Sequence, residues 1–282
     1  MGQDQSKILE HDLQQIADML LLNGTLTECP GLVHGKMGIA VFFFHYAQYT
    51  DNILFADYAM DLIGETLSQI HVNSPADYEK GIAGIGVGID YLIRNNFLNV
   101  EDDICEDFDG RMLRAVLYDP WPDFSQYDGL TGYGRYWMTR LCYQAPAALA
   151  QECLFRVVGC IEERLSDIQA DEQTDVYCFL QHDLKEIPGF DRCSGLLEQC
   201  RKNRDFPRLG DSAAGNIIRL YLRKRYFNDA SQAEIDIALQ QIPALDMEKP
   251  PAATGLLTGY AGEGMLRLTA LNQTNISWMN LL

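Results

Sequence analysis

The sequence predicts an all-α protein, a closed alpha/alpha toroid of about six helical hairpins. Two kinds of helical segment alternate along the chain: segments with apolar residues on one face, and segments that are apolar nearly all round. Gly-x-x-Gly pairs open four of the segments of the second kind, and the first pairs follow one another at steps of 46 and 48 residues. A repeat of this length predicts one supersecondary unit per period.

Each hairpin is expected to join one outer helix, apolar on one face, to one inner helix buried between its neighbours. The expected outer helices span residues 6–23, 55–71, 100–118, 146–166, 191–203 and 231–242. The expected inner helices span residues 31–49, 77–93, 127–141, 174–184, 209–225 and 256–271. The fourth inner helix, 174–184, lacks the glycines.

The glycine pairs are expected to mark the mouth of each inner helix. They are Gly35/Gly38, Gly81/Gly84, Gly129/Gly132 and Gly259/Gly262, with Ser212/Gly215 as a weakened copy. Glycine inside a helix costs about 1 kcal/mol relative to alanine, so a compensating role is expected. We expect a strip of bare backbone that a neighbouring helix or loop can approach, with unpaired N–H groups pointing outward.

Closure into a ring is predicted from the two ends of the chain, which lack polar caps. The last eight residues, NISWMNLL, are largely apolar and are expected to pack against the first hairpin. An open array, which would require capped ends, is the alternative. In either case the repeats predict one domain over residues 1–282.

Charge and hydropathy narrow the function classes. Forty acidic and 22 basic residues give a net charge of −18, which argues against nucleic-acid binding. The charge would suit a basic peptide partner, but a purely solubilising surface is the favoured interpretation. No apolar stretch approaches the roughly 20 residues of a membrane span, so no membrane partner is expected. The first twelve residues do not resemble a secretion signal, and a cytoplasmic location is the expectation.

Four stretches carry the glycine pairs: GLVHGKMG (31–38), GIAGIG (81–86), GLTGY (129–133) and GLLTGYAG (255–262). With them, nearly the whole chain resembles the lanthionine synthetase C-like (LanC-like) family, whose members are alpha/alpha toroids with Gly-x-x-Gly motifs on their inner helices. The resemblance implies peptide modification: zinc-assisted addition of a peptide cysteine thiol to dehydroalanine or dehydrobutyrine, as in lanthipeptide cyclases. Zinc would supply the thiolate, which a free thiol with a pKa near 8.5 yields only partly at pH 7.

The family's zinc motifs, Trp-Cys-Tyr-Gly and Cys-His-Gly, are absent from this sequence. If LGDSAAG is the counterpart of the second motif, Gly210 and Asp211 occupy the ligand positions; if GLLTGYAG is, Leu257 and Thr258 do. The stretch nearest to the first motif is 207–210. Such side chains cannot form a three-ligand zinc site, so we expect neither a metal cofactor nor zinc-dependent cyclase activity. The family's usual seven hairpins also exceed the six expected here.

The candidate catalytic residues are His34, Asp128 and Asp211, all near helix mouths. His34 precedes the first glycine pair and is a candidate proton carrier; the alternative is a hydrogen bond that caps a neighbouring loop. Asp128 holds the equivalent place two repeats later, as an acid or a peptide anchor; the alternative is an N-cap of the 129–141 helix.

The candidate substrate-binding residues are Arg208, Tyr133, Tyr260 and Trp121. Arg208 is expected to pair with Asp211 at the fifth mouth. The three aromatic residues are expected to line the central cavity, with packing in the core as the alternative.

Three functions are open at this point. The first is a LanC-like protein without zinc that binds a peptide or a peptide-modifying enzyme. The second is a metal-independent enzyme that acts on a small molecule or sugar in the cavity through paired carboxylates, Asp128 with Asp211 or Glu79. The third is an assembly partner that binds through its outer acidic surface. The sequence does not decide whether the chain is an enzyme.

Overall fold

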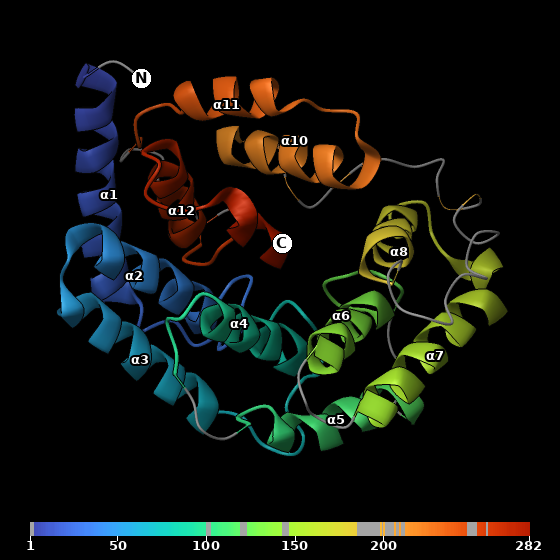
Figure 1. Ribbon diagram of the computed structural model, residues 1–282. Coiled ribbons are helices and arrows are strands. Elements are labelled where there is room, and N and C mark those ends of the chain that lie inside the picture. Colours follow the sequence, from blue (N-terminus) through green and yellow to red (C-terminus); the bar gives the residue numbers. More distant parts are fainter. Residues whose placement is uncertain are drawn as a thin grey trace. The chain divides into compact units, whose positions relative to one another are not determined.

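A computed structural model describes residues 3–99, 103–118, 123–142, 147–184, 198, 200, 206, 209, 212–246, 253–257 and 259–282. Every regular element among these residues is helical, as the sequence predicts (Figure 1). No helix in this part of the chain combines the length and the apolar character that crossing a membrane requires. The chain divides into two compact units.

Unit 1 combines the two ends of the chain, residues Met1–Ile70 and Arg208–Leu282. Its elements are α1 (Gln3–Asn23), α2 (Lys36–Thr50), α3 (Ile53–Ser68), α10 (Ala213–Phe227), α11 (Gln232–Gln240), α12 (Tyr260–Ala270) and the 3₁₀ segment η5 (Ile276–Leu281).

Unit 2 is the central part of the chain, His71–Pro207. Its elements are α4 (Ile82–Arg94), α5 (Glu106–Leu117), α6 (Leu130–Cys142), α7 (Ala147–Glu163), the 3₁₀ turn η1 (Leu165–Asp167), α8 (Gln173–Cys178) and the π-helical segment η2 (Phe179–Asp183).

The predicted helices occur, but the inner helices with glycine pairs begin three to five residues later than predicted. The helix expected over 31–49 begins at Lys36, and the one expected over 77–93 begins at Ile82. In both, the first glycine of the pair is the N-cap residue in an extended conformation. The residues directly before each glycine are therefore part of a loop, in which Leu32, Val33 and Tyr78 are buried. The helix expected over 191–203 lies outside the described residues except for Glu198 and Cys200.

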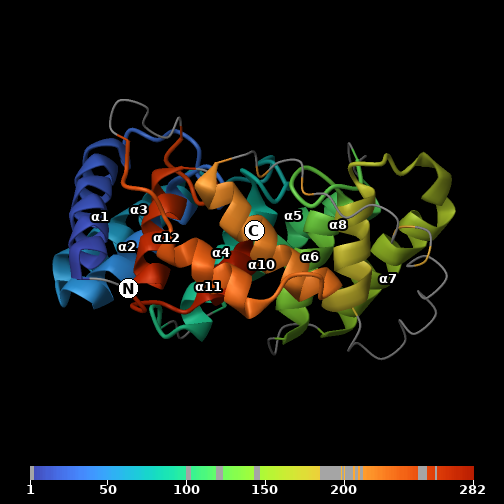
Figure 2. The same cartoon turned by 90° about the horizontal axis from the view of Figure 1, so that it is seen from above.

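The core of unit 1 forms around α2, whose residues from Lys36 to Ala47 are all buried. Helix α3 packs along α2, and α12 packs against both α1 and α2 (Figures 1 and 2). Phe42 of α2 lies over Gly264 of α12, where a Cβ atom would stand 2.3 Å from its ring. The last helix of the chain is thus a direct neighbour of the first two.

The core of unit 2 forms around α6, which packs against α4, α5, α7 and η2. Tyr136 of α6 lies over Gly86 of α4, and Phe179 of η2 lies over Gly134 of α6. These two glycines and Gly264 each stand five residues after the first residue of their glycine pair. One aromatic-on-glycine contact therefore joins inner helices in both units.

The C-terminal segment contacts α10 and α12. Trp278 is fully buried and donates to Thr269 Oγ1 of α12 at 3.0 Å, while Asn280 Oδ1 accepts from the Tyr221 hydroxyl of α10 at 2.5 Å. The predicted link to the first hairpin occurs one residue before the NISWMNLL stretch, where Thr274 Oγ1 contacts His45 Nδ1 of α2 at 3.0 Å. The segment covers α10 and α12.

Candidate functional site

Each unit has its own candidate site, built from two mouth loops that each end at the first glycine of a pair. We define mouth loops 1, 2, 3 and 6, by hairpin, as residues 29–35, 75–81, 123–129 and 253–259. Loops 1 and 6 belong to unit 1, and loops 2 and 3 belong to unit 2.

Each mouth loop folds back beneath the helix it precedes. The N–H of the first helical residue donates to the carbonyl seven residues earlier: Lys36 to Cys29 (2.9 Å), Ile82 to Pro75 (3.0 Å), Leu130 to Asp123 (3.1 Å) and Tyr260 to Ala253 (3.0 Å). These hydrogen bonds satisfy a donor that a helix N-terminus otherwise leaves unpaired. The expectation of outward-pointing, unpaired N–H groups is therefore wrong at this position.

Glycine is required where a loop carbonyl occupies the space of a side chain, which is the case at Gly35, Gly38, Gly81, Gly129, Gly132, Gly259 and Gly262. A Cβ atom on Gly35 would lie 2.3 Å from the Cys29 carbonyl oxygen, and one on Gly132 would lie 2.1 Å from that of Gln126. In both cases the carbonyl belongs to the residue six positions earlier. The predicted close approach of a loop is confirmed, and the loop is the helix's own.

Neighbouring mouth loops are joined by a second repeated hydrogen-bond pattern. In unit 2 the N–H groups of Tyr78 and Glu79 both donate to the Tyr127 carbonyl, at 2.9 and 3.0 Å. In unit 1 the N–H groups of Leu256 and Leu257 both donate to the Val33 carbonyl, at 2.8 and 3.4 Å. In both units, the two donor residues lie three and two residues before the N-cap glycine of their own loop. The acceptor residue lies two residues before the N-cap glycine of the neighbouring loop. The last and first hairpins thus meet as two consecutive hairpins do.

The fourth inner helix has carboxylates at both glycine positions, a feature that sequence reasoning missed. Glu172 is the N-cap residue of α8, and Asp175 follows three residues later. Glu172 Oε1 accepts from the Phe124 N–H at 3.0 Å, and Asp175 Oδ2 accepts from the Gln126 N–H at 2.9 Å. Mouth loop 3 is therefore held from both sides.

Asp128 lies on this firmly held loop. Its N–H donates to Ser125 Oγ at 3.2 Å, and its residue is half-buried. Helix α6 begins at Leu130, so Gly129 and not Asp128 stands at the N-cap position. Burial raises the pKa of Asp77 on mouth loop 2, and the negative charges of Asp128 and Glu79 raise it further. Asp128 and Asp77 are therefore electrostatic neighbours.

His34 occupies the equivalent position in unit 1, directly before the N-cap residue Gly35. It is half-buried, and its backbone lies against mouth loop 6, where a Cβ on Gly255 would stand 2.4 Å from the His34 Cα atom. The third residue at this position is Lys80, which sequence reasoning missed although it too precedes an N-cap glycine. Lys80 Nζ forms an ion pair with Glu79 Oε1 at 3.2 Å.

Two of the three aromatic residues predicted to bind substrate, Tyr133 and Tyr260, have largely buried side chains. Tyr133 and Tyr260 are each 6% exposed, and burial raises the pKa of Tyr260. Tyr260 is the first residue of α12, so it lies at the same end of unit 1 as His34. Trp121, Arg208 and Asp211 lie outside the described residues, and the predicted Arg208–Asp211 pair with them.

One position that the family resemblance assigns to a zinc ligand has no donor atom. If GLLTGYAG corresponds to the family's Cys-His-Gly motif, Leu257 occupies one of the two ligand positions. Leu257 is a buried aliphatic residue, and its side chain has no atom that could bind zinc. Among the side chains that the structure describes, no three His, Cys, Asp or Glu residues form a group that could hold a metal ion. Gly210 and Asp211 lie outside these residues.

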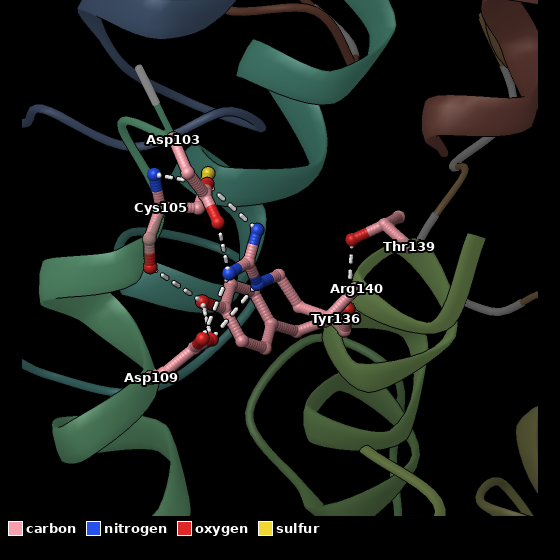
Figure 3. A network of polar contacts seen from close by, with 6 residues as sticks. All are labelled: Asp103, Cys105, Asp109, Tyr136, Thr139 and Arg140. Atoms are coloured by element: carbon pink, nitrogen blue, oxygen red, sulfur yellow. Dashed lines mark hydrogen bonds and ion pairs between the residues drawn. The ribbon is translucent and has the colours of Figure 1, made fainter. Parts of the chain in front are cut away.

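Each unit also contains a buried arginine that ties an inner helix to an outer helix. In unit 2, Arg140 of α6 binds Asp109 of α5 through Nε (2.9 Å) and Nη2 (2.8 Å), and it binds Asp103 through both terminal nitrogens (Figure 3). The Tyr136 hydroxyl donates to Asp109 at 2.7 Å in the same network (Figure 3). Hydrogen bonds from Arg140 lower the pKa of Asp103. This network fixes the helix that follows mouth loop 3.

In unit 1 the buried arginine is Arg267 of α12, only 1% exposed. Its Nε donates to Asp12 Oδ2 of α1 at 3.1 Å, and its Nη1 donates to Glu263 Oε2 at 2.5 Å. The Leu245 N–H also donates to Asp12, at 2.8 Å. Arg267 therefore joins the last helix of the chain to the first.

None of the family models compared with the chain matches it, and no curated protein matches its sequence.

Proposed function

We propose that the chain is a LanC-like toroid protein that binds a peptide, or an enzyme that modifies one, at its helix mouths and does not itself close thioether rings. The observation that carries this proposal is the junction of mouth loops 6 and 1. Its two N–H donors and single carbonyl acceptor repeat the junction of consecutive loops 2 and 3. A repeat array in which the last unit meets the first as a consecutive unit favours a closed ring over an open array.

Peptide binding at the mouths is supported by the side chains directly before the N-cap glycines. Those at mouths 1, 2 and 3 are His34, Lys80 and Asp128, all able to bond or pair with a peptide. The loop that carries Asp128 is held by backbone and carboxylate hydrogen bonds on both sides. Side chains on firmly held loops can bind a ligand at a lower cost in entropy.

The proposal is tested with a peptide that contains one cysteine and one dehydroalanine. Because thioether closure conserves mass, the free thiol must be measured by alkylation, alongside binding and the zinc content of the purified protein. We expect binding, a thiol that stays free, and no stoichiometric zinc. His34→Ala and Asp128→Ala should each weaken binding at least about tenfold, or about 1.4 kcal/mol. About one zinc per chain, or loss of the thiol, would overturn the proposal.

Ring closure is tested separately by small-angle scattering. A compact chain of this length has a radius of gyration of about 19 Å, whereas an open array is longer. We expect a value close to that of the compact chain.

A second candidate is a metal-independent enzyme, supported by one observation. Burial and the negative charges of Asp128 and Glu79 raise the pKa of Asp77, and enzymes use carboxyl groups with shifted pKa values for acid–base catalysis. A panel of chromogenic glycosides assayed against pH would test it. Hydrolysis abolished by both Asp77→Asn and Asp128→Asn supports this candidate, and activity that survives both changes removes it.

A further inference from the structure

The outward side of α3 in unit 1 carries a mixed apolar and acidic surface. Three of its apolar side chains are largely exposed: Ile53 (70%), Leu54 (67%) and Met60 (48%). Helical spacing places exposed Asp57, Asp61 and Gly64 beside them. We define the α3 face as Ile53, Leu54, Asp57, Met60, Asp61 and Gly64.

The rest of α3 is used for packing on α2. The Phe55 ring stacks on Phe43 at 5.9 Å and meets Tyr46 at 4.8 Å, and the Tyr58 ring meets Phe43 at 4.9 Å. Ala59, Leu62, Ile63 and Thr66 are buried on the same helix. The core of unit 1 therefore has no need of the α3 face.

Gly64 has no packing reason within the described structure. A Cβ atom there would meet no atom within 4 Å, in contrast to the glycines of the mouth loops. Glycine in an exposed helix interior lowers helix stability relative to alanine. It also allows a second backbone to approach closely, which a helix docked along α3 would use.

Charge complementarity indicates which kind of partner can bind the α3 face. A second copy of the chain, at net charge −18, would bring like charges together, including Asp57 and Asp61 of both copies if the faces paired. Nucleic acid and anionic lipid surfaces are repelled for the same reason. A partner helix with apolar residues on one side and lysine or arginine beside them would match both the apolar and the acidic positions.

We propose that the α3 face docks a cationic amphipathic helix of a partner protein. Its apolar residues cover Ile53, Leu54 and Met60, and its basic residues pair with Asp57 and Asp61. The α3 face contains none of the mouth-loop residues, so this interaction stands or falls independently of peptide binding at the mouths.

The test uses the full chain and a synthetic leucine–lysine peptide of about 18 residues, with leucines at helical spacing. Fluorescence anisotropy should show saturable binding at micromolar concentrations. Ile53→Ser/Leu54→Ser and Asp57→Lys/Asp61→Lys should each weaken it at least about tenfold. The matched control is Glu152→Lys/Glu162→Lys on α7, which changes the net charge equally at exposed positions and should change affinity less than about twofold.

Three results would overturn the proposal: no saturable binding, equal weakening by the α7 control, or a native dimer in sedimentation that Ile53→Ser/Leu54→Ser dissociates. Thermal unfolding of each variant verifies that the fold is intact. The two proposals are tested with different peptides and with variants of different residues, so failure of the mouth proposal is distinguishable from failure of this one.

Discussion

Unit 1 and unit 2 have the same backbone at their helix mouths but use different side-chain contacts to hold their helices together. The backbone contacts, a carbonyl seven residues back and two N–H donors onto one neighbouring carbonyl, occur in both units. The buried arginines differ in position: Arg140 joins helices close in sequence, whereas Arg267 joins the two ends of the chain. The glycine pattern therefore sets the repeat, whereas polar side chains stabilise each unit locally.

The largest expected effect comes from removing the buried carboxylate that pairs with each arginine. Asp109→Ala in unit 2 and Asp12→Ala in unit 1 leave a buried guanidinium short of a partner, which should lower the free energy of unfolding by about 3–5 kcal/mol. Urea denaturation of both variants measures it. Asp103, whose side chain is 39% exposed, is the control, and Asp103→Ala should cost about 1 kcal/mol or less.

The second effect tests the shared backbone. Gly132→Ala in unit 2 and Gly262→Ala in unit 1 each place a Cβ atom 2.1 Å from a loop carbonyl oxygen. The loop must move in both, so each change should lower the free energy of unfolding by about 3 kcal/mol. A loss in one unit and none in the other would show that the two mouths are not equivalent.

The third effect is a pH dependence that arises in unit 1. His45 of α2 is 7% exposed, and burial lowers its pKa from 6.5 to about 4. The unfolded chain therefore binds a proton below pH 6.5 that the folded chain does not bind until about pH 4. Stability from this group is complete above pH 6.5 and is lost as the pH falls, by about 2 kcal/mol at pH 5.

Urea denaturation at pH 7 and pH 5 measures this loss. His45→Gln removes the titrating group. Between the two pH values, the free energy of unfolding of the variant should therefore fall by about 2 kcal/mol less than that of the native chain. Equal losses in the two proteins would show that His45 does not contribute.

The smallest effect has the opposite sign and concerns glycines on outer helices. Gly64 of α3 and Gly110 of α5 have open space where a Cβ atom would stand. Alanine at either position should raise the free energy of unfolding by about 0.5–1 kcal/mol through higher helix propensity. Thermal unfolding of Gly64→Ala and Gly110→Ala would reveal it, and a loss of stability would contradict this account of the two kinds of glycine.

The sequence predicts the helices of both units well because their apolar spacing survives in the fold. It misplaces the starts of the inner helices, since Leu32 and Val33 are as buried in a loop as they would be in a helix. Gly35 is the N-cap residue of α2, so the helix begins only after the first glycine of the pair. The candidates His34 and Asp128 do lie at equivalent mouth positions, because both precede an N-cap glycine.

Other parts of the site could not be predicted. Glu172 and Asp175 replace the glycine pair by accepting hydrogen bonds from loop amides about 50 residues earlier, and periodicity carries no information about such contacts. The pairing of Arg267 with Asp12 depends on the last helix meeting the first. Side-chain pairs across this sequence distance follow only once the packing of the helices is known.

The last hairpin meets the first as consecutive hairpins meet, and amide hydrogen exchange can measure this contact residue by residue. The Leu256 N–H, bonded to the Val33 carbonyl, should be protected to the same degree as the Tyr78 N–H, bonded to the Tyr127 carbonyl. Gly255→Ala, which places a Cβ atom 2.1 Å from the Val33 carbonyl oxygen, should remove the protection of Leu256 and leave that of Tyr78. Exchange of Leu256 at the rate of an unstructured amide in the native chain would contradict the claim.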